Sequence, residues 1–384
     1  YLGHVCTFKT AQLRDVGAWR AGYEGSQDYD LILRYTEIYN KVIHIPEVLY
    51  HWRVHSESAA MSEAVKPYAY RAAQKALLEA MNRRGWEATV DFLDSFRGYR
   101  IRFNLLNQQA LVSIIIPSKN KAELLRKCFR SIERLSTYRN FEIILIDNLS
   151  DEKDFFKLVN QYSGQKKISF KCVQDKESFN FSRLINLGRR NASGDFLLLL
   201  NNDTEVISPD WLEAMMEHAQ RREIGVVGAK LLYDNDTIQH AGVVVGLGGA
   251  AGHVLVGEDR DGPGYFNYVN MLNTFSAVTA ACFMVRTAVF DEVGGFDESF
   301  GTEYNDVDFC LKVREAGYQN LYVPHCELYH HESMSRGHPH STAESYKKHV
   351  REVNLFRKKW KNYVERDPCY NPNLSLGVHN FGLK

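Results

Sequence analysis

The sequence lacks most of the signals that mark secreted, membrane-spanning or nucleic-acid-binding proteins. Its seven cysteines are scattered among 384 residues without a Cys-x-x-Cys pair, which argues against a disulfide framework or a zinc site. No apolar run reaches the roughly 18 residues of a membrane span, and no signal-peptide pattern precedes the predicted fold. Basic and acidic residues balance at 47 each, so no net positive field attracts nucleic acid. We therefore expect buried thiols in a reducing compartment and no nucleic-acid partner.

The chain does have enough apolar material for a well-packed interior. Hydrophobic residues make up 45% of it and aromatic residues 12%, as in ordinary globular proteins. Its length suffices for two domains, or for one large domain with additions. A start at Tyr1 rather than at methionine is what a fragment of a longer protein would show.

A segment of about sixty residues at the start of the chain occurs again near its end. The matched pairs are Val16-Gly17 with Val293-Gly294 (offset 277, 293 − 16), Asp28-Tyr29-Asp30 with Asp306-Val307-Asp308 (offset 278, 306 − 28), Pro46 with Pro324 (offset 278), and Leu49-Tyr50-His51 with Leu328-Tyr329-His330 (offset 279, 328 − 49). Offsets that drift by single residues are what loop insertions produce. We interpret residues 1–60 as a partial copy of a later half-domain, without a matching upstream half.

The next segment, residues 61–110, is interpreted as a connector that packs against the domain after it. Apolar residues recur at three- and four-residue spacing over 62–84, which predicts a helix. Looser alternation over 86–103 predicts a small hairpin. At the other end of the chain, residues 346–384 form a tail that we expect to wrap the main domain.

Strand and helix patterns alternate from residue 111 onward. Buried strands are predicted at 112–116, 141–146, 168–173 and 197–200, separated by helices at 122–135, 151–162 and 182–191. This alternation implies parallel strands with right-handed crossovers. The predicted fold class is therefore α/β: a Rossmann-like, mostly parallel sheet with helices on both faces, plus the partial duplicated half-domain.

Polar residues follow these strands where each one ends. Asn201, Asn202 and Asp203 come directly after the strand at 197–200, and Asp147 follows the strand at 141–146. Open α/β sheets bind ligands at the carboxyl ends of their strands. An Asn-x-Asp there offers the oxygen ligands that suit Mg²⁺ or Mn²⁺ carrying a diphosphate. An ordinary Asx turn is the alternative at both places.

A glycine-rich segment, Gly246-Leu247-Gly248-Gly249, mimics a dinucleotide-binding finger after a valine run. Such a finger must open a helix, but the residues from Val254 onward look like strand and turn. We reject this interpretation and expect the segment 246–264 to be a loop over the cleft.

Four motifs in this order resemble family-2 glycosyltransferases with the GT-A fold. The residues that carry the resemblance are 112–117, 143–147, 197–203, and 305–308 with 329–330, and it covers about 111–345. It looks closest to bacterial enzymes of O-antigen and capsule assembly, rhamnosyltransferase-like in type. Residues 1–60 resemble the acceptor half of a second such domain.

The resemblance implies a metal-dependent, inverting transfer of a sugar from a nucleotide-diphosphate sugar to a glycan or lipid-linked acceptor in surface polysaccharide synthesis. It also implies a cytoplasmic protein, or one peripheral to the inner membrane and associated with membrane-bound assembly machinery. The partial copy at 1–60 is expected to have no activity of its own.

The resemblance also assigns residues to the donor. Asp203 stands at the last position of the family's acidic metal motif, with Asn201 in place of the first acid, and His330 is the expected further ligand of Mg²⁺ or Mn²⁺. Asp147 is expected to bind the base and ribose. The expected nucleotide-binding residues are Pro117, Ser118, Asn120, Asp147, Asn186, Asn201 and Asn202.

On the acceptor side, Asp306 is the expected general base. Asp306 and Asp308 lie two apart at a predicted helix start, so one can cap the helix while the other faces the cleft. Glu303, Trp211 and His331 are weaker acceptor-side candidates; His331 also competes with His330 for the metal, and Trp211 could equally be a core residue.

Two other functions stay open from the sequence. A nucleotidyltransferase also uses acids on such a sheet, but it is expected to carry a glycine-rich basic loop where Pro117-Ser118-Lys119-Asn120 stands. A glycan- or nucleotide-binding module without transfer activity is favoured by the two asparagines, Asn201 and Asn305, at positions that are usually acidic in the family.

Overall fold

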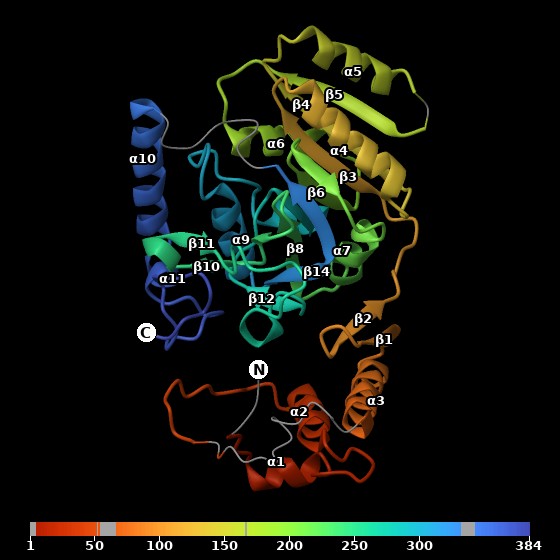
Figure 1. Cartoon of the computed structure of the whole chain (residues 1–384), viewed down its shortest axis with the longest axis vertical. Coiled ribbons are helices and arrows are strands. Elements are labelled where there is room, and N and C mark those ends of the chain that lie inside the picture. The colour runs from red at the N-terminus through yellow and green to blue at the C-terminus, as the bar shows by residue number, and fades with distance from the viewer. Residues whose placement is uncertain (1–4, 52, 54–66, 166, 332–341) are drawn as a thin grey trace. The chain divides into compact units, whose positions relative to one another are not determined.

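The computed structural model describes residues 5–51, 53, 67–165, 167–331 and 342–384 (Figure 1). The chain divides into two compact units, residues 1–104 and residues 105–384. Parts of the predicted segments 1–60 and 61–110, namely residues 1–4, 52 and 54–66, lie outside the described residues. Within the described residues, no helix combines the length and the apolar character that crossing a membrane requires.

The first unit consists of three helices and a hairpin. The helices are α1 (Thr10–Asp15), α2 (Gln27–Ile38) and α3 (Pro67–Arg83), and the hairpin pairs β1 (Ala88–Leu93) with β2 (Gly98–Phe103). The predicted apolar stripe of α3 is buried, including Ala76 and Met81. Ion pairs Arg20–Glu79 and Arg83–Glu37 join α3 to the segment around α2. The helix of the predicted connector therefore packs within the first unit.

The second unit is built on one large mixed sheet. Its strands, in spatial order, are β12 (Asn273–Phe275), β14 (Gln319–His330), β8 (Ile224–Leu232), β13 (Cys282–Arg286), β6 (Phe196–Leu200), β3 (Val112–Ser118), β4 (Phe141–Asn148) and β5 (Ser169–Asp175). The predicted parallel set is confirmed, because β6, β3, β4 and β5 are parallel neighbours. The β13 strand runs antiparallel between β6 and β8, and the short strands β7 (Thr204–Val206) and β9 (Ile238–His240) pair with β14 and β8.

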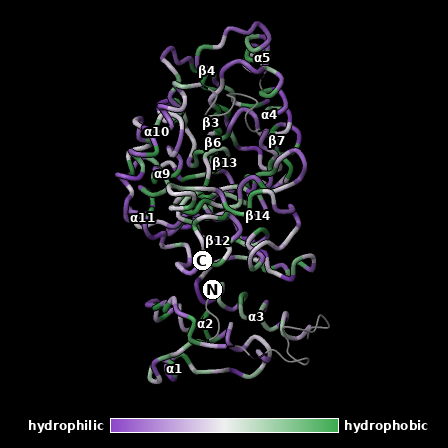
Figure 2. The backbone as a smooth tube through the Cα atoms, turned by 60° about the vertical axis from the view of Figure 1, so that its left-hand side comes forward, coloured by the Kyte–Doolittle hydropathy of each residue, from purple (hydrophilic) through white to green (hydrophobic). Residues whose placement is uncertain are grey.

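Helices cover both faces of this sheet, as the continuous apolar strands predict. Ile114 and Ile116 of β3 point into the core that contains α4 (Ala122–Leu135), α5 (Lys153–Ser163) and α7 (Trp211–Ala219). Ile115 points into the opposite core, which contains α6 (Phe181–Asn191), α8 (Thr287–Glu292) and α9 (Asn305–Glu315). Figure 2 shows hydrophobic segments around β3, β6 and β13 and mostly hydrophilic segments toward the outside.

The C-terminal tail is an integral part of the second unit. It forms α10 (Ala343–Lys359) and α11 (Lys361–Glu365) and then irregular structure. The buried Glu352 carboxylate accepts backbone N–H bonds from Gly301, Thr302 and Glu303. Asp367, also buried, accepts from Val245 N and Ser276 Oγ, and desolvation by burial raises its pKa. The tail thus fixes the loop that leads into α9.

We predict that Gly188→Ala destabilises the second unit by roughly 1–3 kcal/mol, because α6 packs so closely on β3 that a Cβ atom at this position would lie 2.3 Å from Ile115 Cγ2. The control is Arg190→Ala, at an exposed position of the same helix, which should change stability by less than about 0.5 kcal/mol. Scanning calorimetry of both variants measures the difference. Equal melting temperatures would contradict the close packing.

Candidate functional site

The site lies where the chain reverses its order across the sheet. From β3 the chain builds β4 and β5 on one side, and then returns to place β6 on the other side of β3. Crevices at such switch points are where open α/β sheets bind ligands. At this place Asn202 Nδ2, just after β6, donates a hydrogen bond of 2.9 Å to Ser118 Oγ at the end of β3. Two of the predicted nucleotide residues are therefore in contact.

The other predicted nucleotide residues of β3 and β4 lie at the same edge. Asp147, almost fully buried, accepts a hydrogen bond of 3.0 Å from Ser150 N through its Oδ1 atom. This bond to the backbone three residues on stabilises a turn, which agrees with the turn that the sequence left as an alternative to nucleotide binding. Asn120 Oδ1 accepts from Asp151 N and Glu152 N, which ties the loop after β3 to the loop after β4. Pro117 is buried within β3.

Asp203 and His330 meet because strand pairing brings their segments together. In the antiparallel pair of β7 and β14, His330 lies opposite Thr204, and His331 N donates to Asp203 O at 2.9 Å. As a result His330 Nε2 lies 3.3 Å from Asp203 Oδ1 and 3.2 Å from Asn201 Nδ2. Three predicted residues therefore form one cluster, although His330 lies 127 positions after Asp203 in the chain (330 − 203).

Gln239 of β9 orients His330, and the sequence analysis did not identify it. Its side-chain Nε2 donates to His330 O at 3.2 Å, and its Oε1 lies 2.6 Å from His330 Nδ1. An amide oxygen accepts only, so Nδ1 carries the proton and Nε2 presents a lone pair toward Asp203. A glutamine in a short strand has no pattern that would have predicted this role.

A cavity of about 500 Å³ opens beside this cluster. Its lining includes Asn201, His330, Glu303, Asn305 and Asp306. Further lining residues belong to the hairpin of β10 (Val243–Val245) and β11 (Ala251–His253). The glycine-rich segment therefore forms a wall of the cavity, and the rejection of a dinucleotide finger is confirmed, because Leu247–Gly249 is a single 3-10 turn.

The two acids at the start of α9 have different environments. Asp306 lines the cavity, and its carboxylate accepts from Ala280 N at 3.0 Å and from Val307 N at 2.8 Å. Asp308 is fully buried, where it accepts from Trp360 Nε1 and pairs with Lys359 at 2.7 Å. Asp306 alone of this pair has a carboxylate that faces the cavity.

Asn305 and His253 belong to the cavity wall, and the ring of His240 lies against that of His253. Asn305 is 5% exposed, and its Nδ2 atom has no hydrogen-bond partner among the described residues. His240 is fully buried with its ring 4.8 Å from that of His253. Desolvation by burial holds the pKa of His240 well below its usual range. Glu303, also in the lining, contacts His349 Nδ1 at 2.5 Å.

Three predicted residues lie outside this cluster. The expectation of an acceptor platform at Trp211 is wrong: the side chain is fully buried in the core, and Nε1 donates to Ser136 Oγ at 2.9 Å. Asn186 bonds the backbone of Phe296 through both its oxygen and its nitrogen, so its amide is committed to the fold. His331 does not line the cavity and contacts Asp234 at 2.5 Å.

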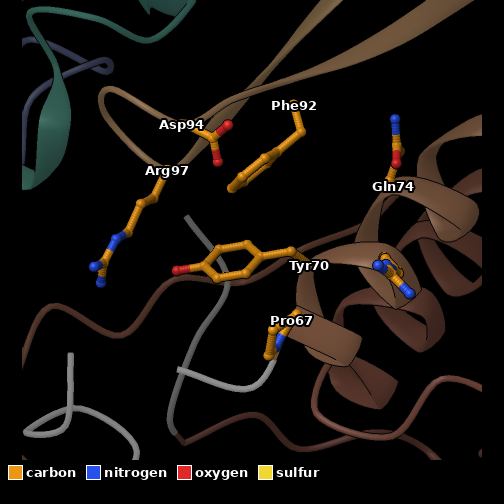
Figure 3. Close-up of a pocket in the computed structure, with 7 residues that line it drawn as sticks. Pro67, Tyr70, Gln74, Phe92, Asp94 and Arg97 are labelled. Carbon is orange, nitrogen blue, oxygen red and sulfur yellow. The ribbon is translucent and has the colours of Figure 1, made fainter. Parts of the chain in front are cut away.

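A second cavity of about 500 Å³ lies in the first unit, between α3 and the hairpin. Figure 3 shows Tyr70 of α3 and Phe92 of β1 facing one another there, with Asp94 and Arg97 near the turn. It contains none of the predicted site residues.

The fold, with polar side chains gathered at its switch point, defines an α/β domain of the kind that binds ligands at the carboxyl ends of its strands. Comparison with known proteins gives the family: residues 113–294 match glycosyl transferase family 2, so the chain carries a family 2 glycosyltransferase domain. The crystal structure of GalNAc-T7 with UDP, GalNAc and Mn²⁺ superposes with a TM-score of 0.55 over 75% of this chain and 55% of that one, at 16% identity. This likeness confirms the predicted GT-A fold.

Two relatives align with the whole of this chain. The uncharacterised protein y4gI of Sinorhizobium fredii is 43% identical over 387 residues, and the O-antigen biosynthesis protein RfbC of Myxococcus xanthus is 34% identical over 394 residues. The chain spans only 42% of the first relative and 29% of the second. Both relatives are therefore much longer than this chain.

We predict that Trp211→Ala lowers the free energy of unfolding by about 3–5 kcal/mol, because it empties a fully buried site. The control is Trp19→Ala, whose side chain is 58% exposed, and a change within about 0.5 kcal/mol is expected there. Thermal unfolding of both variants provides the comparison. If Trp211→Ala is as stable as the parent, Trp211 is not a core residue, and a role in stacking on the acceptor sugar becomes possible again.

Proposed function

We propose that this chain transfers a sugar from a nucleotide-diphosphate sugar to a hydroxyl of a glycan or lipid-linked acceptor, with inversion at the anomeric carbon. The observation that carries this proposal is the cavity that Asp306 lines together with Asn201 and His330, which contact one another beside Asp203. A donor diphosphate bound at the carboxyl edge of β3 and β6 would then have a carboxylate across the cavity. One side of the cavity would then bind the donor and the other would accept a proton from the acceptor. A transferase needs both functions, whereas a binding protein needs only the first.

Asp203 and His330 fit a divalent cation. The lone pair of His330 Nε2 and the Asp203 carboxylate oxygen face each other at 3.3 Å, an arrangement of two acceptors that a shared cation stabilises. The hydrogen bond from Asn201 Nδ2 to the same nitrogen would be replaced. Among the described residues no group of three His, Cys, Asp or Glu side chains is placed to hold a metal. The donor diphosphate would therefore complete the coordination.

When bound, Mg²⁺ or Mn²⁺ supplies positive charge that stabilises the departing diphosphate. The side chains of this protein would carry out the proton transfer and bind the acceptor. Asp306, held by Ala280 N and Val307 N, takes the proton of the acceptor hydroxyl. The acceptor oxygen forms its bond to the anomeric carbon as the bond from that carbon to the diphosphate breaks. Asn305 Nδ2 is a donor available to a sugar hydroxyl, since it has no partner among the described residues.

The donor end of the cleft would be formed by Ser118, Asn120, Asp147 and Asn202, which meet at the edge of β3 and β4. We infer a role in surface polysaccharide synthesis, supported by the whole-chain similarity to an O-antigen biosynthesis protein. Such work is done beside membrane-bound assembly machinery, so we propose a location in the cytoplasm or peripheral to the inner membrane.

A binding module without turnover is the second candidate, since Asn201 removes one negative charge from the metal motif. A nucleotidyltransferase is disfavoured because the turn after β3, Pro117-Ser118-Lys119-Asn120, lacks a glycine-rich phosphate loop. Assaying transfer and hydrolysis over a panel of nucleotide sugars, with and without Mn²⁺, separates the enzyme from the binding module. Ligand binding without any turnover would favour the module.

We predict that Asp306→Asn lowers the rate of sugar transfer by about 10²–10⁴-fold and leaves nucleotide affinity unchanged, because the amide cannot accept the hydroxyl proton. The matched control is Asp28→Asn, the counterpart of Asp306 in the repeated segment, which should leave turnover unchanged. Steady-state transfer assays and nucleotide titrations measure both effects. Full turnover by Asp306→Asn would remove it as the base, and a loss caused by Asp28→Asn would give the first unit a part in catalysis.

We predict that Asp203→Ala abolishes the Mn²⁺ dependence of nucleotide-diphosphate binding, because it removes a direct ligand. Gln239→Ala should weaken Mn²⁺ binding by about 10–100-fold, because His330 loses the acceptor that fixes its tautomer. Gln174→Ala, at an exposed position of β5, is the matched control. Calorimetric titration with Mn²⁺ and nucleotide diphosphate measures the affinities. Unchanged affinity in both site variants would contradict the metal site.

A further inference from the structure

The repeat in the sequence is also a repeat of hydrogen bonds. At the end of α1, Val16, Gly17 and Ala18 donate their backbone N–H groups to the carbonyls of residues 12, 14 and 13. At the end of α8, residues 293, 294 and 295 donate to the carbonyls of residues 289, 291 and 290. Each bond in one set has its counterpart in the other at an offset of 277. The two segments therefore have the same local fold.

A basic side chain at equivalent positions of α2 and α9 extends the correspondence between the two segments. Arg34 of α2 donates to Val16 O and Ala18 O, and Lys312 of α9 donates to Val293 O and Gly295 O. Arg34 and Lys312 are related by the offset of 278 that relates α2 to α9. Both side chains fasten a helix to the turn before it. Residues 10–38 thus repeat residues 287–315 in structure as well as in sequence.

The two copies differ in the segment after the second helix. In the second unit this segment is β14, which lies between β8 and β12 with Leu321, Val323 and Leu328 buried. The counterpart residues 41–51 belong to no helix or strand. Their apolar side chains are exposed, with Ile43 at 76%, Ile45 at 59% and Leu49 at 69%. Residues 5–9, the counterpart of β13, likewise form no strand and are mostly exposed.

We propose that residues 41–51, the docking segment, form a strand by adding to the sheet of a nucleotide-binding half of a second family 2 domain. The β14 strand indicates how: it pairs parallel to β8, with Leu321 beside Val227 and Val323 beside Ala229. The docking segment has the same alternation at Ile43 and Ile45, and it leaves backbone and apolar groups for a partner sheet. An exposed apolar segment of this kind marks an interaction surface.

The second unit shows which kind of sheet such a segment joins. The segment that buries β14 in the second unit is residues 105–277, which contains β8 and β12. The docking segment and β14 share their sequence pattern. A sheet like the one that holds β14 would therefore match the docking segment in the position of its hydrogen-bonding groups and of its apolar side chains. This inference does not depend on the proposed transfer activity, and its test does not use that activity.

The test places a copy of residues 105–277 directly before Tyr1 of the full chain, since the offset of 277 aligns Tyr1 with Val278. Hydrogen exchange measured by mass spectrometry then follows peptides that cover residues 41–51. In the parent chain these amides should exchange at nearly unprotected rates. In the fusion they should exchange at least about 100-fold more slowly, because they enter a sheet. The matched control is the fusion with Ile43→Asp and Ile45→Asp, in which exchange should stay fast.

Fast exchange at residues 41–51 in the unsubstituted fusion would overturn the proposal. An added copy that stays unfolded would also overturn the proposal, because docking should complete the fold of that copy. Peptides spanning β3 come from both copies of residues 105–277, so an unfolded copy would appear as two equal populations, one exchanging slowly and one exchanging fast. A separate measurement uses the parent chain with Ile43→Asp and Ile45→Asp. Its melting temperature should stay within about 2 °C of the parent, since both side chains are exposed. Unfolding of the first unit, or loss of a self-association that the parent shows, would identify its own core or a second copy as the occupant.

Discussion

The short antiparallel pair between β7 and the end of β14 is the contact on which the candidate site depends. It places His330 opposite Thr204, and therefore places the imidazole beside Asp203 and Asn201. Neither segment could do this by itself, because β7 follows the parallel strand β6 and His330 ends β14, more than 100 residues later in the chain. Backbone hydrogen bonds fix their separation, which side-chain contacts between flexible loops would not do.

The second constraint is burial on both faces of the sheet. Because β3 and β4 contribute alternate residues to two cores, neither strand can shift by one residue without exposing its apolar set to the wrong side. Their carboxyl ends are therefore held at one level, where Ser118, Asp147 and Asn202 meet. The tail reinforces the other side of the cavity, since Glu352 binds the backbone of the loop that leads into α9. The two halves of the cavity are thus positioned by separate parts of the chain.

The repeated segment shows how much a strand depends on its neighbours. Residues 41–51 and β14 share a pattern, yet only β14 lies in a sheet. The turn that ends α1 has the same backbone hydrogen bonds as the turn that ends α8, because a helix satisfies most of its backbone groups within its own segment. A strand cannot do so, and its structure depends on the strands that flank it. Local sequence therefore determines α1 and α2, but not the conformation of the segment after them.

The sequence alone determined the parallel strands, the helices on both faces and the polar residues at the strand ends, because burial periodicity and strand-end chemistry are local signals. It also indicated that only one of Asp306 and Asp308 could face the cleft. The family resemblance pointed to Asp306, and the tertiary structure places Asp306, and not Asp308, in the cavity lining. The structure also places Trp211 in the core and commits the Asn186 amide to a loop more than 100 residues away. It also identified Gln239 as the residue that orients His330. These are contacts between residues distant in the chain, and no local pattern records the partner that a polar side chain meets only after the chain has folded.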